Sequence, residues 1–93
     1  MTDAEFRARL DEEVTVGRMT EKERDDLLDQ KRVFDEHLPP GDTSLRREFQ
    51  GRIVGYVAGE RRIDWEIHKL LDSAKETYPG RMIYFEPIGF DLY

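Results

Sequence analysis

The stretch from residue 51 to residue 89 decides the fold, and it reads GRIVGYVAGERRIDWEIHKLLDSAKETYPGRMIYFEPIG. Two short apolar runs, residues 53–58 and 82–85, lie on either side of a segment with the periodicity of an amphipathic helix. The first run is continuously apolar, which predicts a strand that is buried on both faces or central in its sheet. Gly55 within this run indicates a bulge or a close approach of another backbone. We therefore predict a small sheet packed on one helix.

The segment between the two apolar runs predicts a hairpin and then a helix. Gly59 and Glu60 are typical of a turn, after which residues 61–63 are expected to form a short second strand. Asp64 is a good N-cap for a helix over residues 65–78. The apolar residues of that helix have the spacing of one buried face: Ile67, Leu70, Leu71, Ala74 and Tyr78. The last strand follows and is expected to be interrupted by Pro87.

The N-terminal part of the chain predicts two helices. Residues 2–5 and 20–23 both have the Thr-x-x-Glu spacing of a capping box, in which each side chain accepts a hydrogen bond from the other residue's backbone N–H. The helices are expected over residues 2–16 and 20–38, and Gly17 ends the first. The short connection predicts an antiparallel hairpin. Its apolar stripe is thin, so the hairpin must pack against another surface.

These expectations combine into an α+β protein. A helical hairpin occupies residues 1–41, and a β-β-α-β unit with one helix on the sheet occupies residues 42–93. Asp42 or Ser44 caps a short linking helix between them. A chain of this size buries about 65% of its unfolded surface, which is enough for one modest core. We therefore expect the two parts to form one cooperative domain.

Composition excludes several classes of function. The net charge of −6, with 21 acidic against 15 basic residues, argues against general nucleic-acid binding. A local basic patch from Arg46, Arg47, Arg52, Arg61 and Arg62 is the alternative, although such runs are more often solvated. The chain has no cysteine, so a disulfide framework and a thiolate zinc site are excluded. No segment has the length of a membrane span and no signal-peptide core is present, so we expect a cytoplasmic protein that contacts no membrane.

Residues that could perform chemistry have ordinary explanations. His37 and His68 are the only histidines, and neither has a second histidine one helical turn away. Two acidic clusters, Asp25–Asp26–Asp29 and Asp11–Glu12–Glu13, are interleaved with basic residues and are expected on solvated helix faces. We therefore predict no catalytic residue, no metal site and no cofactor.

Aromatic residues indicate an interaction surface instead. Trp65 and the C-terminal residues Phe90, Leu92 and Tyr93 must be either buried or displayed. Displayed aromatics next to polar residues are typical of interface cores. The alternative for the C-terminal residues is that they fold back over the small core. Both alternatives stay open at this point.

Two segments resemble known families. Residues 45–89, with an aromatic and a glycine before a strand, then a turn, a helix, a proline-containing loop and a final apolar strand, resemble a family of small prokaryotic domains of unknown function. That resemblance implies a β-β-α-β arrangement and no known activity. Residues 14–31, VTVGRMTEKERDDLLDQK, are similar to the short helical hairpins called SHOCT domains. This second resemblance implies a role in oligomerisation.

The leading functional hypothesis is a non-catalytic protein-interaction or oligomerisation module, whose partner is a second copy of the chain or another protein. The alternative is a small acidic regulator of the antitoxin or repressor-modulator kind. A small enzyme ranks third, because no nucleophile, base or metal constellation is visible.

Overall fold

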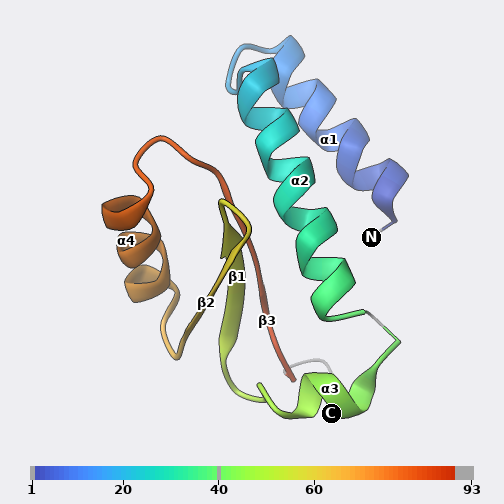
Figure 1. The fold of residues 1–93 in the computed structure, drawn as a ribbon. Helices are drawn as coiled ribbons and strands as arrows, with labels where there is room; N and C mark the ends of the chain where they lie inside the picture. Colours follow the sequence, from blue (N-terminus) through green and yellow to red (C-terminus); the bar gives the residue numbers. More distant parts are fainter. Residues whose placement is uncertain (1, 40, 90–93) are drawn as a thin grey trace.

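The computed structural model describes residues 2–39 and 41–89. Phe90, Leu92 and Tyr93 lie outside the described residues, so their predicted place in an interface stays a prediction. The described elements are α1 (Asp3–Thr15), α2 (Glu21–His37), α3 (Thr43–Arg47), β1 (Ile53–Val57), β2 (Glu60–Asp64), α4 (Ile67–Thr77) and β3 (Ile83–Pro87). The predicted α+β class is confirmed, with a helical hairpin followed by a β-β-α-β unit (Figure 1).

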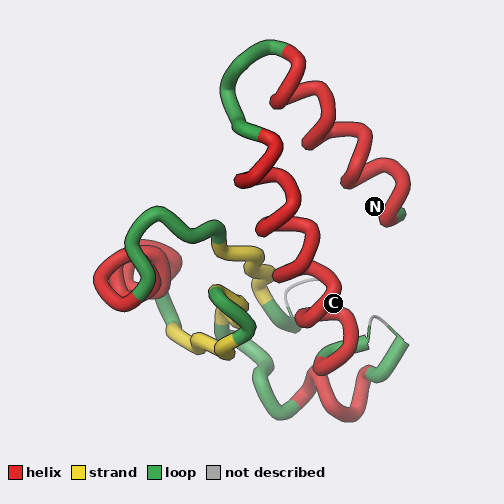
Figure 2. Tube along the Cα trace, turned by 45° about the horizontal axis from the view of Figure 1, so that its top comes forward, coloured by secondary structure: helices red, strands yellow, loops and turns green. Residues whose placement is uncertain are grey.

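The three strands form one antiparallel sheet in the order β2-β1-β3, with helices on both faces. α2 contacts β1 and β3 on one face, whereas α4 contacts β1 and β2 on the other. Figure 2 shows α4 and α2 on opposite sides of the strands. The central strand β1 is therefore covered twice, and four of its five residues are buried. This confirms the prediction made from its continuously apolar sequence.

The main core lies between α2 and the sheet. It consists of side chains that are almost completely buried: Phe34, Leu38, Val54, Tyr56 and Ile88. The ring of Phe34 meets the rings of Tyr56 and Tyr84 edge-on, at centroid distances of 5.9 and 5.2 Å. The surface that the helical hairpin needs is thus the sheet of the same chain. Residues from both sequence halves contribute to this core, while cooperative unfolding of the two halves stays a prediction.

The helix termini follow the sequence signals with one difference. At Thr20 both halves of the capping box form, because Glu23 N–H donates to Thr20 Oγ1 at 3.1 Å and Thr20 N–H donates to Glu23 Oε1 at 3.0 Å. At Thr2 the Glu5 N–H donates to the threonine, but the described residues show no return bond from the glutamate. Gly17 has a φ of +82°, the left-handed conformation expected after a helix.

The β1–β2 turn is one residue earlier than expected. Ala58 and Gly59 have φ of +51° and +76°, and Val57 pairs with Glu60, so Glu60 belongs to the strand. Two-residue turns with two positive φ values match the twist of a hairpin. The expectation of a Gly59–Glu60 turn is wrong, because an alanine in the sequence does not indicate a left-handed conformation.

The predicted cap of α4 is also wrong. The helix begins at Ile67, and its N-cap residue Glu66 makes no side-chain capping bond. The Asp64 carboxylate instead accepts a hydrogen bond from Glu66 N–H at 3.1 Å, the local turn that aspartate favours as readily as a cap. Trp65 therefore lies in a bend between β2 and α4 rather than on the helix.

The end of the sheet differs from the expectation at Pro87. Pairing resumes after the proline, since Ile88 N–H donates to the Arg52 carbonyl and Gly51 N–H donates to the Ile88 carbonyl, both at 2.9 Å. Pro87 therefore does not end the association of β3 with β1. Gly55 lies in an unbroken register, so the bulge alternative is excluded and close packing remains. A Cβ atom there would lie 3.0 Å from Ile83 Cδ1 and 3.2 Å from Phe85 Cβ.

Candidate interaction surface

Trp65 is the most exposed large apolar side chain of the described residues, with 67% of its surface accessible. The guanidinium of Arg52 lies over its ring, 4.9 Å from the centroid. Gly51 has a φ of +83°, which glycine adopts without strain, and this turn lies beside the ring: a Cβ atom there would be in ordinary contact with the indole at 3.5 Å. One part of the indole is thus held by the chain, while most of it faces solvent.

The strand before Trp65 extends this surface. Arg61 and Ile63 pair with Tyr56 and Val54, so all four side chains point to the α2 face of the sheet. α2 covers β1 and β3 on that face, and Ile63 beside them is 37% exposed. Arg61 lies 5.2 Å from the ring centroid of Phe49, and its Nε donates to Tyr56 Oη at 3.0 Å. We call Phe49, Arg52, Arg61, Ile63 and Trp65 the Trp65 patch.

The Trp65 patch is locally positive on an acidic protein. Within residues 2–39 and 41–89, no carboxylate lies at ion-pair distance from Arg52 or Arg61. Arg62, on the opposite face of β2, is engaged instead with Ser73 at 2.7 Å and Glu60 at 3.5 Å. Arg46 is engaged too, because its guanidinium donates to the carbonyl of Leu38 at 3.0 Å, at the end of α2. The basic patch considered from sequence is thus divided: Arg52 lies over Trp65, and Arg61 lies over Phe49.

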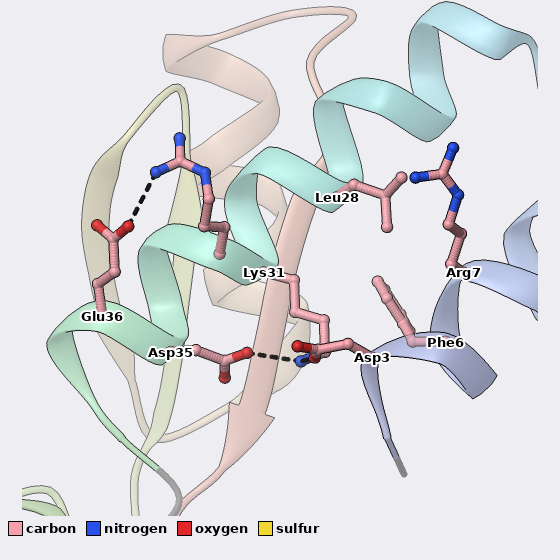
Figure 3. A pocket seen from close by; sticks show the side chains of 8 residues that line it. Asp3, Phe6, Arg7, Leu28, Lys31, Asp35 and Glu36 are labelled. Atoms are coloured by element: carbon pink, nitrogen blue, oxygen red, sulfur yellow. Dashed lines mark hydrogen bonds and ion pairs between the residues drawn. The ribbon is translucent and has the colours of Figure 1, made fainter.

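A second candidate is a pocket of about 460 Å³ between α1 and α2 (Figure 3). Lys31 lies at its centre, and its Nζ donates to Asp3 at 2.7 Å and to Asp35 at 2.6 Å. The same ammonium lies 5.6 and 5.7 Å from the ring centroids of Phe6 and Tyr84. The remaining lining residues are Arg7, Leu28, Arg32 and Glu36.

The charges around this pocket satisfy one another. Burial disfavours the ammonium of Lys31, but its hydrogen bonds to Asp3 and Asp35 outweigh burial and raise its pKa. A nucleophilic lysine needs the opposite shift. Arg32 is paired with Glu36 at 2.9 Å. These contacts connect α1 to α2 and pair the ammonium of Lys31 with the carboxylates beside it.

The acidic cluster on α2 contains one residue that is not on a solvated face. The Asp26 carboxylate accepts two hydrogen bonds from Arg81 and one from Met82 N–H, each at 2.9 Å. The Arg81 guanidinium, helped by the Met82 N–H, holds the pKa of Asp26 below its usual value. Gln30, buried to 3% exposure, donates to Asp26 and accepts from Gly59 N–H at 2.9 Å. This network attaches α2 to the hairpin turn and to the loop before β3, whereas Asp25 and Asp29 are exposed as expected.

The histidines have structural surroundings. Nδ1 of His37 lies 2.9 Å from the Val33 carbonyl oxygen and therefore donates to it. The imidazole stacks on the ring of Tyr56, with 5.3 Å between the ring centroids. His68 is exposed on α4. Burial, with a hydrogen bond to Glu86, raises the pKa of Tyr84 well above its usual value. In the part of the chain that the structure describes, no three His, Asp or Glu side chains are grouped so as to hold a metal ion.

Comparisons with known proteins give no relative. No family model, no curated protein and no solved structure matches the chain. The resemblances of residues 45–89 and 14–31 therefore stay predictions. Among the described helices, none combines the length and apolar character that crossing a membrane requires.

Proposed function

We propose that this chain is a non-catalytic protein-interaction module whose binding surface is the Trp65 patch. The observation that carries the proposal is the exposed indole of Trp65, held by Arg52 at the open side of β2. Tryptophan and arginine are the residues most enriched at the energetic centres of protein interfaces. An exposed aromatic next to an aliphatic residue, Ile63, and bordered by arginines is the arrangement such centres have.

The direction of the pKa shifts supports the non-catalytic part. Asp26 has a lowered pKa, while those of Lys31 and Tyr84 are raised. Each shift moves the pKa further from pH 7, so the group keeps one protonation state, whereas general acid–base catalysis needs a pKa near the working pH. The shifted groups thus serve to join α1, α2 and the sheet.

Three baits, the wild type, Trp65→Ala and a control variant, test the proposal. Affinity capture from a lysate of the source organism is combined with light scattering of each purified protein. A partner, including a second copy, that the wild type retains and Trp65→Ala loses supports the Trp65 patch. Val16→Ala is the matched control, because Val16 is also an exposed apolar residue, with 55% of its surface accessible, but lies at the far end of α1. Equal retention by all three baits, with unchanged mass, contradicts the proposal.

A further inference from the structure

We propose that the outer edge of β2 binds an extended acidic segment of a partner protein. The segment adds to the sheet as a fourth strand and places carboxylates against Arg52 and Arg61. This binding mode rests on the proposed function and specifies the partner chemistry at the same surface.

The strand order leaves β2 with a free edge. β2 pairs with β1 on one side, and within the described residues no strand lies on its other side. Such an edge presents unpaired backbone N–H and C=O groups, and the addition of an extended peptide to it is a recurrent mode of recognition. The opposite edge, β3, is less suitable because Pro87 within it has no N–H to donate.

The side chains of β2 define what an added strand must carry. Arg61 and Ile63 point to the α2 face, where α2 leaves β2 uncovered. Directly opposite residues of neighbouring strands have Cβ atoms about 4.5–5.5 Å apart. A carboxylate opposite Arg61 and an aliphatic side chain opposite Ile63 would therefore meet complementary groups. Because Arg61 and Ile63 are two positions apart on one face, the partner segment is expected to carry an acidic and an aliphatic residue two positions apart.

The charge of the Trp65 patch selects an acidic partner. Arg52 and Arg61 lack ion pairs within the described part of a chain whose acids outnumber its bases by 21 to 15. A nucleic acid also carries negative charge, but it has no alternating N–H and C=O groups with which to add to the edge as a strand. The net charge of −6 further opposes a polyanion. An extended acidic peptide uses both the edge and the arginines.

Trp65 is the only tryptophan, so its fluorescence reports binding directly at the patch. The probe is the seven-residue peptide Asp-Thr-Val-Thr-Asp-Thr-Val, which carries Asp and Val on one face of a strand, and the same peptide with Lys in place of Asp is its control. We expect a saturable change in Trp65 emission with the acidic peptide alone. Arg52→Glu should weaken binding at least tenfold. Arg9→Glu makes the same change in net charge on the exposed surface of α1 and should alter the affinity less than twofold.

Amide exchange measured by NMR distinguishes strand addition from contact with side chains alone. Saturation with the acidic peptide should slow exchange in β2. Three results would each overturn the inference: an emission change without slower exchange in β2, equal affinity of the peptide for wild type and Arg52→Glu, or tighter binding of an oligothymidylate than of the peptide. If the peptide does not bind at about 1 mM, but affinity capture finds a partner that the wild type retains and Trp65→Ala loses, this inference is overturned and the proposed function is not. The same failure without such a partner contradicts the proposed function as well.

Discussion

Phe34 should be the side chain on which the joining of the helical hairpin to the sheet depends most. It is fully buried between Tyr56 and Tyr84, which it meets edge-on at 5.9 and 5.2 Å. Truncating a buried phenylalanine to alanine costs about 3–5 kcal/mol. At about 0.05–0.15 kcal/mol per residue, 93 residues supply about 5–14 kcal/mol in total. Phe34→Ala therefore removes a large share of the free energy of unfolding and can leave too little for a measurable transition.

Phe34→Leu keeps the measurement within range. It retains most of the apolar volume but loses two aromatic contacts worth about 0.5–1.5 kcal/mol each, a loss of about 1–3 kcal/mol. With a urea dependence of about 1.5 kcal/mol per molar, the midpoint should fall by about 0.7–2 M. Val16→Ala is the control, because Val16 is exposed and its replacement should change stability by less than about 0.5 kcal/mol.

Two probes follow the urea transition in different parts of the chain. Circular dichroism in the far ultraviolet reports mainly on α1 and α2, and Trp65 fluorescence reports on the bend after β2. We expect the two curves to coincide in the wild type and to shift together in Phe34→Leu, as one cooperative domain requires. A midpoint unchanged by Phe34→Leu, or a fluorescence transition that stays while the dichroism transition moves, would refute this reasoning.

Three further predictions concern separate features. Asp26→Asn should lower the urea midpoint at neutral pH. Because the folded pKa of Asp26 lies below its unfolded value, the stability that the carboxylate contributes is complete above about pH 4 and is lost as the pH falls further. The stability of the variant should therefore fall less steeply below about pH 4 than that of the wild type, and an equal fall in both argues against the network. Ala58→Asn should raise stability by about 0.5–1 kcal/mol, because asparagine tolerates the φ of +51° before Gly59, and a lower midpoint speaks against this turn. Self-association should give a light-scattering mass above 11.0 kDa at high micromolar concentration. Deleting residues 90–93 should then restore the single-chain mass without loss of helix, whereas unfolding of the truncated protein would place the tail in the core.

The elements could be predicted because their signals are local. The continuous apolar run of β1, the capping box at Thr20 and the helical spacing of α4 each depend on neighbouring residues only. Boundaries were less predictable where one residue type serves two conformations. Asp64 is equally suited to cap a helix and to bond the residue two positions on, and the structure has the second. Ala58 gives no sign of its left-handed conformation.

The candidate site depended on contacts between distant residues. Trp65 was named from sequence because it is aromatic, but its exposure follows from the late start of α4 and from the turn that brings Arg52 over the ring. The bonding of Asp26 to Arg81 joins residues separated by 55 positions. No local pattern distinguishes Asp26 from its exposed neighbours Asp25 and Asp29. A signal for Asp26 would have required knowing that α2 lies against the loop before β3.

The most direct test of the Trp65 patch is an amide-exchange map of the complex with the protein that the wild-type bait retains and Trp65→Ala loses. Exchange is compared for the free and the bound chain at the same pH and temperature. The structure predicts that binding slows exchange in residues 60–65 and around Arg52, with α1 unchanged. Slower exchange confined to the pocket between α1 and α2, with β2 unaffected, would contradict the account.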